Sequence, residues 1–184
     1  MNTTITHNPK LSSWIIFLPS SVAILIPLLL PNDFLSHTPV LQSLIGAIAA
    51  FIPGIQKFVS VSDFPEVTTV FLVTSWILLP AQISTWLWLL WRPGVFEKIV
   101  DTANNQTAHG VIKLIATASV GTLFMGYALL FLPIDPAFVG HYGMNSSRVG
   151  LAIFGACGFF AFALSSAILL FLITNLITKA FTHD

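Results

Sequence analysis

The sequence predicts an all-α integral membrane protein, and three observations lead to this prediction. Of the 184 residues, 55% are hydrophobic and only 8% are charged, whereas soluble domains carry about 25% charged residues. The mean hydropathy is +0.89. Long uncharged apolar stretches follow one another along the chain, and a helix needs roughly 20 such residues to cross a bilayer. We therefore expect a single membrane domain that covers residues 1–184 and is surrounded by lipid.

Four stretches are long and apolar enough to cross the membrane, and together they predict a four-helix bundle. They lie at about 13–31, 67–91, 114–134 and 149–178, and none contains Asp, Glu, Lys, Arg or His. Pro19 and Pro27 should kink the first span. The second span follows Asp63 and Glu66, whose spacing predicts a capping box at the start of the helix.

Two further helices are expected outside the spans. The stretch at about 40–59 has apolar residues at helical spacing, but Pro53-Gly54 interrupts it after about a dozen residues, too few to span. It is expected to be an amphipathic interfacial or re-entrant helix. The stretch at about 94–103 alternates apolar and charged residues at helical spacing, which predicts a short cytoplasmic surface helix.

The distribution of Lys and Arg predicts the orientation of the chain. With four spans, one side of the membrane holds five of these residues and the other side holds Lys57 and Arg148. The five are Lys10, Arg92, Lys98, Lys113 and Lys179. Since Lys and Arg are enriched in cytoplasmic loops, both termini are expected in the cytoplasm. We expect the membrane to be the inner membrane of a bacterium.

The composition also excludes several classes of function. A net charge of zero without a basic run lacks the electrostatic footprint of a nucleic-acid-binding protein. Cys157 is the only cysteine, so the chain has no Cys-x-x-Cys pair for redox chemistry. No catalytic motif is present. The histidines fall outside the spans; His37 and His141 share the outer side with Asp33 and Asp135, but solvated loop histidines are the expected state. We expect no enzyme, metal site or cofactor.

Small residues in the last two spans are the candidate packing or partner-binding residues. Helices associate in lipid through close packing and interhelical hydrogen bonds, because lipid tails remove the hydrophobic incentive. Small side chains therefore mark faces where two helices can approach closely. The third span offers Ala118, Thr122 and Gly126, and the fourth offers Ala152, Ala156, Ala163 and Ala167. These faces are expected either to pack the two helices together or to bind a helix of another protein.

Gln82 is the only amide well inside a span. An unpaired amide in hydrocarbon is costly, so its side chain should face protein. The partner is expected to be the carbonyl freed by Pro80, a group on another helix of the chain, or a group on a binding partner.

The arrangement of spans resembles that of a known family. Four spans, a long first outer loop, cytoplasmic termini and the stretch Ser62-Asp63-Phe64-Pro65-Glu66-Val67-Thr68 are similar to the four-span immunity proteins that protect bacteria against pore-forming colicins. This resemblance implies recognition of a toxin's pore domain inside the membrane.

Three functions remain open from the sequence. We expect a non-catalytic protein that binds another integral membrane protein, as an accessory or assembly subunit of a complex. An immunity protein is the alternative. A small-solute transporter or channel lined by Gln82 is the second alternative, although the uncharged spans argue against ion coupling.

Overall fold

The described part of the chain consists of helices joined by short turns and loops. The computed structural model describes the backbone of residues 9–92, 94, 95, 97, 108–131, 143 and 145–181, and these residues contain no strand. The all-helical prediction is confirmed for this part. The elements are α1 (Pro9–Leu29), α2 (Pro39–Ala50), α3 (Pro53–Ser60), α4 (Pro65–Leu90), α6 (Ala108–Phe131), α8 (Arg148–Gly150), the π-helical turn η1 (Leu151–Gly155) and α9 (Ala156–Phe181).

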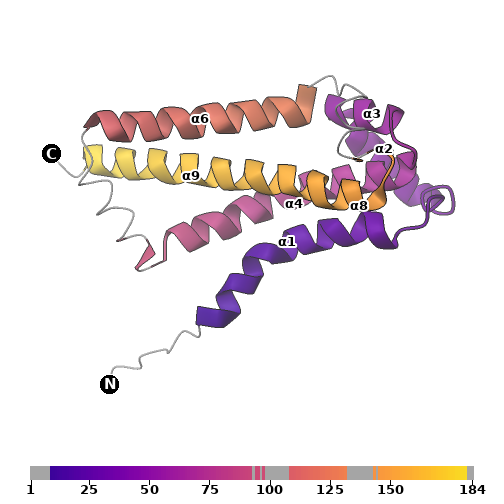
Figure 1. Ribbon diagram of the computed structural model, residues 1–184, viewed down its shortest axis with the longest axis horizontal. Coiled ribbons are helices and arrows are strands. Elements are labelled where there is room, and N and C mark those ends of the chain that lie inside the picture. The colour runs from indigo at the N-terminus through magenta and orange to yellow at the C-terminus, as the bar shows by residue number, and fades with distance from the viewer. Residues whose placement is uncertain are drawn as a thin grey trace.

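The long helices run side by side along the molecule (Figure 1). α4 packs against both α1 and α9, and α6 packs against α9 on the far side from α4. The contacts therefore follow the order α1, α4, α9, α6. The N-terminal end of α1 and the C-terminal end of α9 lie at one end of the molecule, while α2 and α3 lie at the opposite end (Figure 1).

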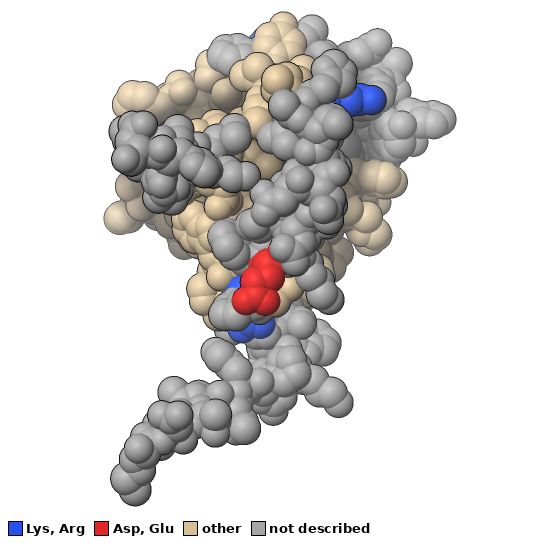
Figure 2. Space-filling model, turned by 90° about the vertical axis from the view of Figure 1, so that its left-hand side faces the viewer, with Lys and Arg blue, Asp and Glu red and all other residues tan. Residues whose placement is uncertain are grey.

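Among the described residues, three helices are long and apolar enough to cross a membrane, which is consistent with an integral membrane protein. They are Pro65–Leu90, Ile112–Leu130 and Arg148–Asn175. The apolar stretch Phe17–Leu29 of α1 is shorter. At the end that carries the termini, only a few charged side chains interrupt the described surface (Figure 2).

The predicted helix at 40–59 is two helices, and the predicted surface helix at 94–103 is mostly undescribed. α2 and α3 meet at an angle of 114°, so together they form a broken span or a re-entrant loop. The bend falls at Phe51-Ile52, immediately before Pro53. Of residues 94–103, only 94, 95 and 97 belong to the described part of the chain.

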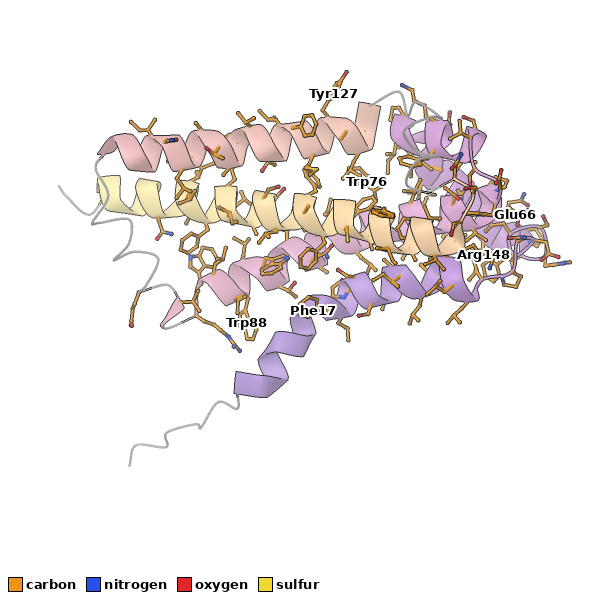
Figure 3. The ribbon with its side chains drawn as sticks, viewed as in Figure 1. Phe17, Glu66, Trp76, Trp88, Tyr127 and Arg148 are labelled. Carbon is orange, nitrogen blue, oxygen red and sulfur yellow. The ribbon has the colours of Figure 1, made fainter. Side chains whose placement is uncertain are left out.

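The core lies where the first half of α4 meets η1 and α9. The Phe71 ring is fully buried, and a Cβ at Gly155 would lie 2.7 Å from its Cε1 atom. Glycine at position 155 therefore gives the ring room. Trp76 makes edge-to-face contacts with Phe159 and Phe162, with ring centroids 5.6 and 6.3 Å apart. Figure 3 shows Trp76 between α4 and α9. Such aromatic pairs add to the apolar burial that joins the two helices.

A close backbone approach attaches α3 to the end of α6. A Cβ at Gly54 would collide with the carbonyl oxygen of Leu129 and lie 3.0 Å from that of Leu130. The last carbonyl groups of a helix have no partner within it, and the Cα of Gly54 lies against two of them. Since backbone atoms cannot yield as a flexible side chain can, only glycine fits at position 54.

We predict that Gly54→Ala lowers the free energy of unfolding by about 1–3 kcal/mol, the usual cost of overpacking. Gly46 of α2 is the matched control, because a Cβ there meets nothing within 4 Å. Gly46→Ala should raise the stability by about 0.5–1 kcal/mol, since alanine favours the helix. Unfolding in detergent micelles, followed by circular dichroism, measures both values. Equal stability of the two variants would contradict the close contact.

Candidate functional site

Gln82 joins two helices of the chain. Its side chain is 4% exposed, and Nε2 donates a hydrogen bond to Oγ of Ser20 on α1. The neighbouring Ser21 instead donates to the carbonyl of Phe17, at 2.8 Å. The amide therefore lies between α4 and α1, near the Pro19 kink. Of the partners expected from the sequence, it uses a group on another helix of the chain.

The small residues of the third predicted span lie at the contact of α6 with α9. Ala118, Thr122 and Gly126 are half-buried, and a Cβ at Gly126 would lie 3.2 Å from Cε2 of Phe162. Glycine at 126 therefore lets the Phe162 ring lie against α6. The Oγ1 atom of Thr122 is buried and has no hydrogen-bond partner in the described part of the chain.

The four alanines of the last predicted span are buried within the chain. Ala152 and Ala156 are 1% and 5% exposed, and Ala163 and Ala167 are fully buried. They lie on η1 and α9, which are packed against α1, α4 and α6. This set is therefore occupied by contacts within the chain.

The opposite face of α6 is exposed along most of its length. Its side chains are large and apolar, and their exposed fractions lie between 57% and 73%. They are Val120, Leu123, Phe124 and Tyr127. Figure 3 shows Tyr127 pointing away from the other helices. The half-exposed Gly121 lies beside this face, and a Cβ there would meet nothing within 4 Å.

At the end opposite the termini, Arg148 caps the C-terminus of α1. Its guanidinium donates to the carbonyls of Leu30 (2.6 Å) and Pro27 (3.4 Å) and to Oδ1 of Asn32. A cation at this position also suits the negative end of the helix dipole. From the sequence alone Arg148 is only one of the basic residues on the outer side, because its contact with α1 depends on how α8 packs.

Glu66 binds the loop that leads from α1 to α2. Its carboxylate accepts hydrogen bonds from the backbone N–H of Leu35 (2.7 Å) and of Ser36 (3.2 Å), and from Oγ of Ser36. The predicted capping box is therefore wrong. The N-cap residue of α4 is Phe64, which makes no side-chain capping bond, and Asp63 is exposed. Glu66 and Arg148 lie at the same end of the molecule (Figure 3).

Of the histidines and aspartates expected on the outer side, His37 and Asp33 lie together. Nε2 of His37 lies 2.9 Å from Oδ2 of Asp33, and this hydrogen bond holds the pKa of the Asp33 carboxyl below its ordinary value. Both side chains are exposed. No group of three potential metal ligands occurs among the described residues. His141 and Asp135 lie outside them.

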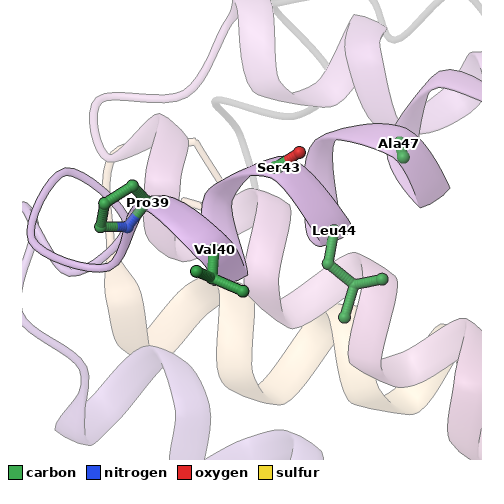
Figure 4. Close-up of a pocket in the computed structure, with 5 residues that line it drawn as sticks. All are labelled: Pro39, Val40, Ser43, Leu44 and Ala47. Atoms are coloured by element: carbon green, nitrogen blue, oxygen red, sulfur yellow. The ribbon is translucent and has the colours of Figure 1, made fainter.

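A shallow groove runs along the outer side of α2 (Figure 4). It is lined by Pro39, Val40, Ser43, Leu44 and Ala47. The side chains of Val40 and Leu44 lie on one side of the helix and Ser43 points to the other (Figure 4). The lining is mostly apolar and carries no charge.

Comparison with known proteins gives no relative for this chain: no family model, no curated protein and no solved structure matches it. The resemblance to colicin immunity proteins therefore stays a prediction. The exposed face of α6 is the candidate binding site.

We predict that Arg148→Ala lowers the free energy of unfolding by about 1.5–3 kcal/mol, the usual value of hydrogen bonds to a charged group. Arg148→Lys should fall between this variant and the parent, because an ammonium cannot reproduce the planar fork. Thermal unfolding in detergent measures the effect. Lys113→Ala is the control, since Lys113 is exposed and a surface substitution changes stability within about 0.5 kcal/mol. Equal losses for Arg148→Ala and Lys113→Ala would contradict the cap.

We predict that Ser20→Ala and Gln82→Leu are not additive. Their coupling should be about 0.6 kcal/mol and at most about 1.7 kcal/mol, the range of interhelical hydrogen bonds in membranes. Unfolding of the parent, both single variants and the double variant measures it. Ser84→Ala is the control partner for Gln82→Leu, because Ser84 donates to the Pro80 carbonyl instead. Full additivity of Ser20→Ala with Gln82→Leu would show that the bond does not form.

Proposed function

We propose that the protein is non-catalytic and acts by binding another integral membrane protein through contacts between membrane helices, as an accessory or assembly subunit of a complex. The observation that carries this proposal is the exposed face of α6 with Gly121 beside it. The amide that would line a solute path, Gln82, is instead bonded to Ser20 between two helices, which favours binding over transport.

The position of α6 supports a role in binding. Along its length α6 packs against α9, and at its C-terminal end it contacts α3. Because α1 and α4 lie on the other side of α9, α6 is at the edge of the row of helices (Figure 1). None of the 18-residue apolar window in Ile112–Leu130 is buried. A helix at this position offers most of its circumference to lipid or to another protein.

Gly121 favours a protein over lipid at this face. Glycine inside a helix costs about 0.5–1 kcal/mol relative to alanine. Glycine at position 126 is explained by packing within the chain, because a Cβ there would crowd the Phe162 ring. A Cβ at Gly121 would meet no atom within 4 Å. In lipid, glycine on a helix surface lets a second helix approach closely. A helix of the partner packed beside Phe124 would contact Gly121 closely. That contact offsets the cost of glycine at this position, which no contact within the described part of the chain does.

The same proposal includes the topology. α1, α4, α6 and α9 would cross a bacterial inner membrane as a four-helix bundle, with both termini in the cytoplasm. The start of α1 and the end of α9 lie at the same end of the molecule, which supports an even number of crossings (Figure 1). The role of Arg148 in capping α1 gives a structural reason for one of the two basic residues on the outer side. The excess of Lys and Arg at the other end then agrees with cytoplasmic termini.

We predict that Gly121→Leu removes the partner without unfolding the protein. The chain, tagged at its C-terminus and expressed at native level, is extracted in mild detergent, and co-purifying membrane proteins are quantified by mass spectrometry. Gly121→Leu should reduce the recovered partner at least about tenfold, which corresponds to about 1.4 kcal/mol. Its stability should stay within about 0.5 kcal/mol of the parent, because the position is open.

A photocrosslinking residue at Leu123 should capture the same partner, and one at Leu25 on the exposed side of α1 is the control. Recovery of a lone chain, or of a partner that Gly121→Leu leaves unchanged, would contradict the proposal. If the chain is recovered alone, challenge of cells with pore-forming toxins tests the immunity alternative.

A further inference from the structure

α2 presents three different sides to its surroundings. Ile45 and Ala49 are buried in the core, with Leu41, Ile48 and Ile52 packed partly against it. At about 100° per residue these positions share one side of the helix. The remaining residues of α2 are exposed, and they divide into two groups of different chemistry.

One exposed group is apolar and the other is polar or small. Val40 and Phe51 are 85% and 86% exposed, and Leu44 is 57% exposed. With Ala47 they follow a spacing of four, three and four residues, which places them in one stripe along the helix. The other exposed group is Gln42, Ser43, Gly46 and Ala50. Each stripe is about a third of a turn from the core-facing side, and Figure 4 shows Leu44 and Ser43 on different sides.

The contact of α3 with α6 fixes the depth of this helix. Gly54 lies against the carbonyl groups of Leu129 and Leu130, and Leu130 is the last residue of the apolar span Ile112–Leu130. The bend at Phe51-Ile52 therefore lies at the level where a membrane span ends. The end of the apolar stripe at Phe51 is thus at the same depth as the last apolar turn of α6. No Asp, Glu, Lys or Arg occurs between Asp33 and Lys57.

We propose that α2 lies in the outer membrane–water interface, with Val40, Leu44 and Phe51 in contact with acyl chains and the stripe of Gln42 and Gly46 facing headgroups and water. α2 and α3 then form a re-entrant pair that enters and leaves the same leaflet. Helices with one apolar and one polar side bind bilayers in this orientation. The protein core, the acyl chains and the water layer each contact one side of α2. Its apolar stripe therefore needs no protein partner.

The test uses spin labels on single cysteines in a Cys157→Ala background, because Cys157 is the only cysteine. Labels at Leu44 and Phe51 probe the apolar stripe, and labels at Gln42 and Gly46 probe the polar stripe. The protein is reconstituted into vesicles of phosphatidylethanolamine and phosphatidylglycerol at low protein-to-lipid ratio. Power saturation then compares collision with oxygen, which concentrates in hydrocarbon, and with a water-soluble nickel chelate. The oxygen-to-nickel ratio should be several-fold higher at Leu44 and Phe51.

Two results would overturn the proposal. Equal nickel access at the two stripes would show that water covers both, and low access of both reagents at Leu44 and Phe51 would show that a second copy of the chain covers them. A label at Leu25 gives the reference value for a lipid-facing position. If either labelled variant loses the parent's unfolding profile, Val40 replaces that position. Because the vesicles contain no other protein, the result does not depend on the proposed partner of α6.

Discussion

Long apolar helices constrain every polar group on them, because a bilayer offers no water and each such group then needs a partner within the protein. Two contacts meet this requirement between segments far apart in the sequence, and a third brings two backbones close together. Gln82 of α4 bonds Ser20 of α1. Arg148 closes the C-terminus of α1, and Gly54 of α3 lies against the last carbonyls of α6. They join α1 to α4 and to α8, and α3 to α6.

Close packing supplies the remaining cohesion, with α4 and α9 at its centre. The buried alanines of α9 let neighbouring backbones approach, as expected where lipid tails give no hydrophobic incentive. Phe159 adds edge-to-face contacts with Phe71 and Trp76. The tight side of α9 therefore faces α4. Where α6 meets α9, the buried hydroxyl of Thr122 has no hydrogen-bond partner in the described part of the chain. The contact between α6 and α9 therefore leaves one polar group unpaired among the described residues.

The sequence was sufficient for the helical class and for the approximate positions of the helices, because long apolar runs have few other folds in a membrane. It also placed the break near Pro53 correctly. It failed where a local motif competes with a distant partner: Glu66 has the spacing of a capping box, yet it binds Ser36, which lies 30 residues away. It named Gln82 as an amide that needs a partner, but the choice of Ser20 depends on how two helices pack.

The exposure of α6 was also beyond the sequence. Apolar residues occur all around this helix, so periodicity does not mark an inner side. The small residues at 118, 122 and 126 identified the side that meets α9, whereas Gly121 differs from Gly126 only in what surrounds it. That difference depends on how the helices pack and cannot be read from the sequence.

The exposed apolar faces of α2 and α6 therefore lead to different conclusions about what covers them. On α2 the apolar stripe lies beside a polar one, and this asymmetry alone orients the helix at the interface, with lipid as a sufficient neighbour. On α6 the large side chains would be equally satisfied by lipid, so their exposure does not by itself require a partner. Gly121 is different, because lipid does not compensate the helical cost of a glycine, whereas a closely packed helix does. The proposed binding surface is therefore on α6 rather than along the groove of α2.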